Sequence, residues 1–529
     1  MKKQFPLLVL GVVIAIWGGQ QLLPLLAPKA EPIILTITMA ESPYIEDISV
    51  NHYKQWLEEQ TGYTLIFNVV APIYSGQAVS DSITDGTLQT DILFSFTTQE
   101  TDFFTPQIIN SLGEGGYIYP LDSLLTDGQS LGAIVTDITS YDLASYLTAE
   151  DGHLYYAPQL DASKLSTADE TLWININWLH TLDLSIPTTT AELAAVLEAF
   201  ATDDPNGNGM LDEVPFASSD DLYPCRDYLI NAFVYNDTDN YRFYADETGI
   251  QFAPTQDGWR EAMIYLSSLY GTDGVNLLTS PLTTHQLSEL TSSASDVLGA
   301  FTTNDVGGVF WNNHFDVPMR YSPVSPIATE DGISHATIST PLPMVGAVIP
   351  ANASNPEAAI TLLNLMLSPE ASLIACYGEE GVDWEYASAT DLDSQGAKAS
   401  VVVHSHYDGL AQNKNFANSG PYYVYPDIAD HVSYTNFDTA YLNNRGLIVQ
   451  QASQPTVILS PIDLTGNQDL YDRALAIEDY TQQWLDGFCD GTYDPSDDAI
   501  WNSYLTGYED LGLTTLLSYI EQTTSINPA

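Results

Sequence analysis

The sequence predicts an α/β protein built from at least two lobes. At 529 residues the chain is longer than one hydrophobic core usually organises. Short runs of β-branched and apolar residues alternate with amphipathic segments over its first two thirds, which is the pattern of α/β lobes. The last third is predicted to be mainly helical, and no internal repeat occurs.

The elements can be placed along the chain from these patterns. After a proline-flanked linker at 28–32, strands are expected at 33–38, 64–69, 91–96, 154–158, 171–176, 306–310 and 345–349. The run at 91–96 is short and apolar enough for a buried parallel strand. Helices are expected at 52–60, 189–200, 356–367, 470–485 and 501–523, the last broken near Gly512.

The composition is strongly acidic. The chain has 69 acidic residues against 13 lysines and arginines, a formal net charge of −56. A nucleic-acid-binding protein needs a basic surface, so this class is excluded, as is peripheral attachment to anionic lipid. Self-repulsion would be screened by salt or divalent ions, so a saline or calcium-containing exterior suits the chain. A compositional bias without functional meaning remains the alternative.

The N-terminal segment, 1–32, predicts export. Lys2 and Lys3 precede an apolar run at 5–17, and a second run at 22–27 brings the apolar stretch to the length of a membrane span. No small-x-small cleavage site and no following cysteine occur. We therefore expect the folded part outside the cell membrane, with 5–27 serving as a signal peptide or a retained anchor.

Residues 203–213 predict a Ca²⁺-binding loop. A capping box at Thr189 and Glu192 starts the preceding helix, whose apolar face would carry Leu193, Val196, Leu197 and Phe200. The loop then presents oxygen ligands at alternating positions, as hard cations require. The expected ligands are the side chains of Asp204, Asn206, Asn208, Asp212 and Glu213 and the carbonyl of Met210.

The end of this loop departs from an EF-hand. Pro215 stands where an EF-hand has its bidentate Glu, and the following residues are unsuited to a second helix. A helix–loop–strand site with a structural ion is therefore expected, and an ordinary Asx/Gly turn is the alternative. The three cysteines, Cys225, Cys376 and Cys489, show no metal-ligand spacing, and buried thiols are favoured over a single bridge.

Taken together, seven stretches resemble, in order, the extracellular solute-binding proteins that serve carbohydrate ABC importers of Gram-positive bacteria. They are GHLYYAP at 152–158, LWININWL at 172–179, DDPNGNGMLDE at 203–213, DVGGVFW at 305–311, NPEAA and SPE at 355–359 and 368–370, and YGEEGVDW at 377–384. The loop at 203–213 is similar to the Ca²⁺ loop of the family's long members. The family's usual lipid-attachment cysteine is absent, and Gly18-Gly19-Gln20 stands in its place.

The resemblance implies a type II periplasmic-binding-protein fold, with a ligand cleft between two α/β lobes joined by a hinge. Lobe one would comprise 33–165 and 335–370, and lobe two 166–334 and 371–525. It further implies a monomer without enzymatic activity, whose lobes close on a carbohydrate, in the long members an oligosaccharide, before delivery to ABC permease subunits.

Aromatic residues followed by polar ones are the candidates for the sugar site, because sugars present apolar faces and rings of hydroxyls. Trp311, followed by Asn312, is the leading candidate, and Phe96 lies where an α/β sheet offers a ligand site. Tyr156, Trp384 and Tyr44 complete the set. For each of them, packing in a core is the alternative.

Two other classes of protein were weighed. A secreted glycoside hydrolase needs two carboxylates across a cleft, and with 69 acidic residues such pairs carry no information. No Gly-x-Ser-x-Gly or His-Glu-x-x-His motif occurs. A surface adhesin would usually show repeats. The hydrolase therefore remains the alternative to a binding protein.

Overall fold

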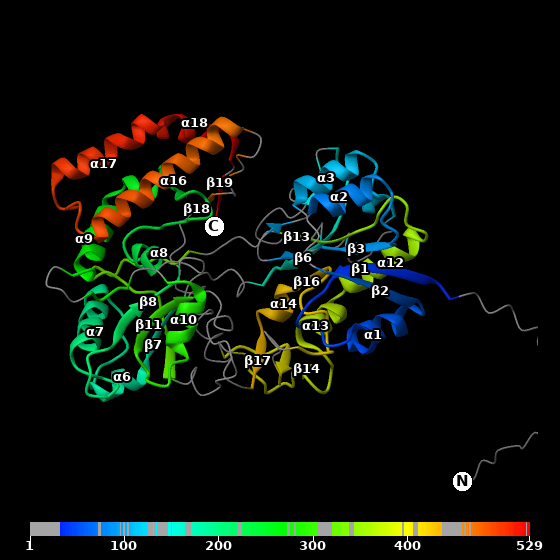
Figure 1. Cartoon of the computed structure of the whole chain (residues 1–529), viewed down its shortest axis with the longest axis horizontal. Coiled ribbons are helices and arrows are strands. Elements are labelled where there is room, and N and C mark those ends of the chain that lie inside the picture. The colour runs from blue at the N-terminus through cyan, green and yellow to red at the C-terminus, as the bar shows by residue number, and fades with distance from the viewer. Residues whose placement is uncertain are drawn as a thin grey trace, which may run out of the picture.

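The computed structural model shows two α/β lobes side by side along the long axis of the molecule (Figure 1). It describes residues 32–528 apart from 72–75, 96, 99–100, 103–104, 125–130, 132–133, 135–146, 150, 164–170, 220–224, 272–275, 280–281, 304–319, 338–342, 394–395, 406–410, 436–456, 460–461, 463, 465–466 and 525. Each lobe has its own hydrophobic core, and the chain passes between the cores three times, after 163, 337 and 435.

Lobe one is built on a six-stranded sheet in the order β16-β6-β13-β3-β1-β2. All neighbouring pairs are parallel except those of β13, which is antiparallel to β3 and β6. The strands are β1 (Ile34–Ala40), β2 (Thr64–Val70), β3 (Ile92–Phe94), β6 (Ala157–Asp161), β13 (Met344–Val348) and β16 (Tyr422–Val424). The predicted parallel pairing of the run at 91–96 is confirmed, because β3 lies parallel to β1.

Helices cover both faces of this sheet (Figure 1). They are α1 (His52–Thr61), α2 (Gly76–Thr84), α3 (Pro106–Glu114), α12 (Pro356–Met366), α13 (Pro369–Tyr377) and the short α14 (Pro426–Ala429). Local signals fix their ends. Asn51 accepts bonds from the amides of Tyr53 and Lys54 at the start of α1, and Gly62 ends that helix at a φ of 71°.

The segment after residue 370 corrects the predicted boundary between the lobes. We expected 371–525 to belong to lobe two, but residues 371–435 complete lobe one. β16 joins the lobe-one sheet, and β14 (Trp384–Tyr386), β15 (Val401–Val403) and β17 (Val432–Tyr434) form a small sheet packed against the same core. Strands of three residues are too short to give a readable alternation, which is why the sequence pattern missed them.

Lobe two contains a four-stranded sheet in the order β12-β7-β11-β8. Its strands are β7 (Thr171–Asn175), β8 (Val214–Ala217), β11 (Leu298–Thr303) and β12 (Tyr321–Val324), and β11 runs parallel to β8 and antiparallel to β7. Around it lie α6 (Ile176–Thr181), α7 (Thr190–Thr202), α8 (Cys225–Ile230), α9 (Asp257–Leu269), α10 (Thr284–Thr291), the hairpin β9 (Phe243–Asp246) and β10 (Gly249–Phe252), and the pair β18 (Val457–Leu459) and β19 (Ile526–Pro528).

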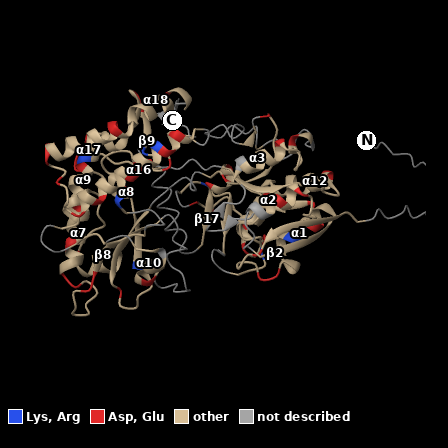
Figure 2. Ribbon diagram, turned by 45° about the horizontal axis from the view of Figure 1, so that its top comes forward, with Lys and Arg blue, Asp and Glu red and all other residues tan. Residues whose placement is uncertain are grey.

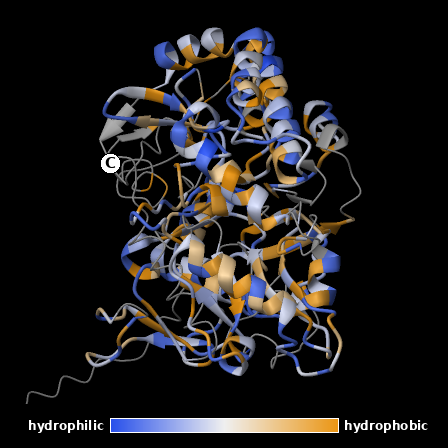
Figure 3. Ribbon diagram, turned by 90° about the vertical axis from the view of Figure 1, so that its left-hand side faces the viewer, coloured by the Kyte–Doolittle hydropathy of each residue, from blue (hydrophilic) through white to orange (hydrophobic). Residues whose placement is uncertain are grey.

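The C-terminal helices form an outer layer on lobe two. They are α16 (Gln468–Cys489), α17 (Asp498–Leu511) and α18 (Leu513–Thr523). The predicted break is confirmed at Gly512, whose φ of 84° is the left-handed conformation that ends α17. Figure 3, which faces this lobe, shows hydrophobic and hydrophilic turns on the same outer helices, as expected for helices with one buried face.

Acidic residues occur along the helices and loops of both lobes, and basic residues are few (Figure 2). No disulfide joins the three cysteines, all of which are described: Cys225 and Cys489 are buried and Cys376 is half-buried. Within the described residues, no single helix is long and apolar enough to cross a membrane. The consecutive helices α12 and α13 reach that length only together, and they meet at an angle of 69°. The apolar segment 5–27 lies outside the described residues.

Candidate functional site

The helix that leads into the predicted ion-binding loop forms as its sequence indicates. The side chain of Thr189 accepts a bond from the amide of Glu192, and the Glu192 carboxylate accepts bonds from the amides of Thr188 and Thr189. These bonds lower the pKa of the Glu192 carboxyl. The residues of the predicted apolar face, Leu193, Val196, Leu197 and Phe200, are all buried. The helix thus fixes one end of the loop against the core of lobe two.

The loop winds around the carboxylate of Asp204. Its Oδ1 accepts the amide of Asn208 at 3.1 Å and its Oδ2 the amide of Gly209 at 3.0 Å. The side chains of Asn206 and Asn208 accept the next amides along the loop, those of Asn208 at 3.0 Å and Met210 at 2.6 Å. The side-chain nitrogen of Asn208, Nδ2, also donates to Asp212 Oδ1 at 2.9 Å. Five of the six predicted ligand residues are therefore joined by one set of hydrogen bonds.

Backbone geometry explains why glycines are needed here. Asp204, Gly207 and Gly209 have φ values of 47°, 70° and 79°, all in the left-handed region. Two glycines adopt it without strain, and Asp is among the residues that tolerate it. After the loop the chain continues into β8 and not into a second helix. The predicted helix–loop–strand order is confirmed.

Glu213 is the residue whose environment fits a cation. Both of its carboxylate oxygens are buried and accept no hydrogen bond, and the side-chain nitrogen of Asn206 is buried without a partner as well. Burial raises the pKa of the Glu213 carboxyl, and the neighbouring carboxylates of Asp204 and Asp212 raise it further. An unpaired buried carboxylate is unfavourable, and a divalent cation would supply the missing partner.

The donor set is mixed. Among the described residues no three His, Cys, Asp or Glu side chains are gathered as a metal-binding group. Amide and carbonyl oxygens would therefore complete the coordination, which suits Ca²⁺ better than a transition metal. The Met210 side chain is 58% exposed, and the carbonyl oxygen remains the only atom of this residue that is predicted to bind the ion.

Two candidates for the sugar site are core residues. Tyr156 and Trp384 are 1% and 0% exposed, and both belong to the core of lobe one. The Trp384 indole donates to the carbonyl oxygen of Gly378 at 2.9 Å. A ring without exposed surface offers no face to a sugar, so for these two residues the packing alternative describes the structure. The motifs at 152–158 and 377–384, which contain these residues, therefore indicate the fold and do not mark a ligand site.

Tyr44 is a half-buried candidate at the end of the lobe-one sheet where strand β1 finishes. It follows β1 at its carboxyl end, where ligands of open α/β sheets bind. Its carbonyl accepts the amide of Gln412 at 3.0 Å, which brings a distant segment to this edge. Trp311, Asn312 and Phe96 lie outside the described residues. The structure therefore does not test the leading candidate.

The segment at 411–420 was missed by sequence reasoning. It is rich in amide side chains, reading AQNKNFANSG, and its backbone bonds to the loop that follows β1, at Tyr44 and Glu46, and to the N-terminus of α1. Ala417 and Asn418 have φ values of 47° and 60°, and Asn418 is exposed. Amide side chains both donate and accept, as sugar hydroxyls do. The number of Asn and Gln residues in this segment was the available signal in the sequence. Only the fold shows that the segment lies next to Tyr44.

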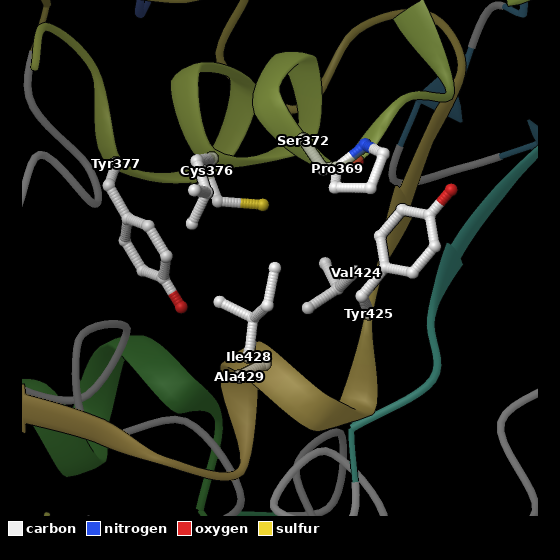
Figure 4. Close-up of a pocket in the computed structure, with 9 residues that line it drawn as sticks. Pro369, Ser372, Cys376, Tyr377, Val424, Tyr425, Ile428 and Ala429 are labelled. Carbon is white, nitrogen blue, oxygen red and sulfur yellow. The ribbon is translucent and has the colours of Figure 1, made fainter. Parts of the chain in front are cut away.

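A small pocket in lobe one does not serve as the sugar site. Figure 4 shows it between α13 and the turn from β16 into α14, lined among others by Cys376, Tyr377 and Tyr425. Its volume is about 220 Å³ even when the space open to solvent is included, below the range of ordinary ligand pockets. The Tyr425 hydroxyl is already bonded to the carbonyl of Leu367. All of its lining residues belong to lobe one.

Comparison with known proteins identifies the fold. The chain matches no protein-family profile. The fructooligosaccharide ABC transporter substrate-binding protein FusA of Streptococcus pneumoniae is 30% identical over 165 residues, which is 29% of this chain and 30% of FusA. The sequence match thus spans less than a third of the length of this curated relative.

Solved structures match over nearly the whole chain. FusA in complex with kestose aligns with a TM-score of 0.66 at 20% identity, covering 92% of this chain and 98% of FusA. A FusA EF-hand mutant in complex with fructo-nystose gives 0.65 at 21%, with the same coverage. A human-milk-oligosaccharide-binding solute-binding protein of Bifidobacterium longum infantis gives 0.65 at 18%, covering 93% and 98%. The expected fold of the solute-binding proteins of ABC transporters is confirmed.

Proposed function

We propose that this chain is an extracellular solute-binding protein that captures an oligosaccharide for an ABC importer and does not chemically change it. The observation that carries the proposal is the two-lobed fold, shared over 92% of the chain with FusA bound to kestose. The local sequence match to the same protein supports it. No observation favours the glycoside hydrolase.

We propose the carboxyl edge of the lobe-one sheet as part of the ligand site. Tyr44 would supply an aromatic face there, and Asn418, the exposed amide side chain of segment 411–420, would supply hydrogen bonds to sugar hydroxyls. Trp311, Asn312 and Phe96 remain proposed ligand residues on the sequence argument alone. Closure of the lobes around the sugar, the mechanism that the fold permits, would bring the two sets together.

The loop at 203–213 is proposed to hold a structural Ca²⁺. The carboxylates of Asp204, Asp212 and Glu213, the side-chain oxygens of Asn206 and Asn208 and the Met210 carbonyl would bind it. The ion would supply positive charge to the buried Glu213 carboxylate and tie the end of α7 to β8. The EF-hand mutant of FusA among the matching structures agrees with a loop of this kind in a relative.

The N-terminal segment is proposed to keep the protein at the outer face of the cell membrane, where it would work as a monomer beside its permease subunits. Mass spectrometry of the mature N-terminus tests this: a chain that starts near Glu31 would show cleavage and release. A chain that retains residues 5–27 would support the anchor.

Calorimetry with kestose, nystose and neutral milk oligosaccharides tests the proposed function. Binding without release of free monosaccharide is the expected result, and hydrolysis of any sugar would overturn it. Trp311→Ala should weaken the affinity about thirtyfold, since truncating an aromatic anchor costs about 2 kcal/mol or more. Trp311→Phe, which keeps a ring, is the matched control and should lose much less.

A further inference from the structure

The two lobes carry similar, very large negative charges. The stretches 32–163 and 343–435, which contain lobe one, hold 29 acidic and 3 basic residues, a net charge of −26. The stretches 171–337 and 457–528, which contain lobe two, hold 36 acidic and 5 basic residues, a net charge of −31. Acidic residues are distributed along the ribbon of both lobes and are not confined to one of them (Figure 2).

The few cations of the described chain are already used inside the lobes. Seven of its eight lysines and arginines form an ion pair, and each pair joins two residues of the same lobe. The eighth is Lys398. Within the described residues no ion pair joins lobe one to lobe two. Nothing in that part of the chain offsets the repulsion between the lobes.

Two consequences follow for a protein whose lobes approach each other around a ligand. Closure brings two bodies of like charge together, so it costs more when the charges are poorly screened. A ligand with carboxylate or sulfate groups is repelled by the negative charge of both lobes. The described lysines and arginines that could bind such groups already pair with Asp or Glu, apart from Lys398. A neutral ligand has no such cost.

We propose that the two acidic lobes make the chain selective for uncharged oligosaccharides and make their capture tighter as ionic strength rises. This inference rests on the proposed function and adds to it the charge class of the ligand and the influence of salt on closure. The expected effect of salt on affinity is opposite to that for a ligand attracted by charge, because salt weakens the binding of such a ligand.

Binding measured at two ionic strengths tests the proposal. The full chain, with Ca²⁺ held constant and saturating, is titrated with kestose, with nystose and with oligomers of alginate, a uronate. Roughly 0.01 M and roughly 1 M sodium chloride give screening lengths of ~30 Å and ~3 Å. The neutral sugars should bind at least about tenfold more tightly at the higher salt. The uronate should show no binding comparable to theirs at the lower salt.

A ligand-free measurement separates this inference from the proposed function. The radius of gyration by small-angle X-ray scattering should decrease as salt rises, because the lobes approach more closely when screened. If no sugar binds at either salt, the proposed function fails, and the scattering still reports on the repulsion. If a neutral sugar binds equally at both salts and the radius of gyration is constant, the proposed function stands and this inference is overturned.

Charge variants distinguish long-range repulsion from specific ion binding. Glu198, Glu261 and Glu521 are exposed on three different helices of lobe two and lie outside the proposed sites. Changing all three to Lys brings the charge of lobe two from −31 to −25. Affinity at the lower salt should rise towards the high-salt value, whereas the matched change of all three to Asp should alter nothing. Equal salt dependence in both triple variants would contradict the proposal, as would tight binding of the uronate at the lower salt.

Discussion

The two lobes use their positive charges differently. The described cations of lobe one are all lysines, Lys54, Lys398 and Lys414, and those of lobe two are all arginines, Arg226, Arg242, Arg260, Arg320 and Arg473. Lys54 pairs with Glu58 one helical turn away on α1, and the two side chains are half-buried. Arg242 pairs with Asp227 and with Glu478, 236 residues away, and its side chain is 3% exposed. The longest ion pair of lobe one among the described residues, Lys414 with Glu379, spans 35 residues, whereas Arg226, Arg242 and Arg260 of lobe two join segments 236 to 260 residues apart.

The difference follows from how each lobe is assembled. Lobe one has a six-stranded sheet whose ladders and apolar faces connect its segments, so ion pairs add little. In lobe two, α16 returns from the far end of the sequence and packs on α9, and Arg242 links it to α8 through two carboxylates and the Asn236 amide. The planar guanidinium can bond several acceptors at once in a buried site, which an ammonium group does less well.

The largest expected effect is that of Arg242→Met. It leaves Asp227 and Glu478 without their cation, and removing one partner of a buried pair typically costs about 3–5 kcal/mol. The matched change in lobe one, Lys54→Met, should cost no more than about 0.5 kcal/mol, the value of an i,i+4 pair. Urea unfolding followed by tryptophan fluorescence measures both. Equal losses would break the contrast between the lobes.

Calcium removal should act mainly on lobe two. A ligand that binds only the folded state stabilises it by about 2.7 kcal/mol at a hundredfold excess over Kd. Chelator should therefore lower the Tm of the lobe-two transition by several degrees, and Asp204→Ala should abolish the chelator effect. The lobe-one transition serves as the internal control. If the melting curves with and without chelator are identical, the proposal that the loop binds Ca²⁺ is wrong.

The helix caps allow a smaller, matched comparison. Thr189 caps α7 in lobe two with a reciprocal box, and Thr105 caps α3 in lobe one with a single bond to the amide of Ile108. Thr189→Ala should cost about 1 kcal/mol, and Thr105→Ala less. Differential scanning calorimetry of the two variants measures the difference. A larger loss from the lobe-one cap would contradict it.

The smallest expected effect concerns pH in the Ca²⁺-free protein. Because burial raises the pKa of Glu213, the folded state disfavours its ionised form. This penalty is present above the folded-state pKa and disappears as the pH falls below the value of an unfolded glutamate. Glu213→Gln should therefore stabilise the Ca²⁺-free protein at neutral pH and have no such effect at acidic pH. Added Ca²⁺ should reverse the order, with the wild type more stable.

Local signals in the sequence determined the elements whose causes lie within a few residues. The capping box at Thr189, the left-handed break at Gly512, the helix–loop–strand order around Asp204 and the parallel pairing of 91–96 were all predicted, and the structure bears them out. Each depends on hydrogen bonds and side-chain periodicity that the neighbouring residues decide.

Contacts between distant segments could be decided only by the tertiary structure. The assignment of 371–435 to lobe one, the burial of Tyr156 and Trp384 and the position of segment 411–420 beside Tyr44 depend on how segments far apart in the sequence pack together. The local sequence around an aromatic residue does not distinguish a residue that faces a ligand from one that packs in a core. The number of apolar neighbours that reach it from elsewhere in the chain settles the matter, and no local pattern records that number.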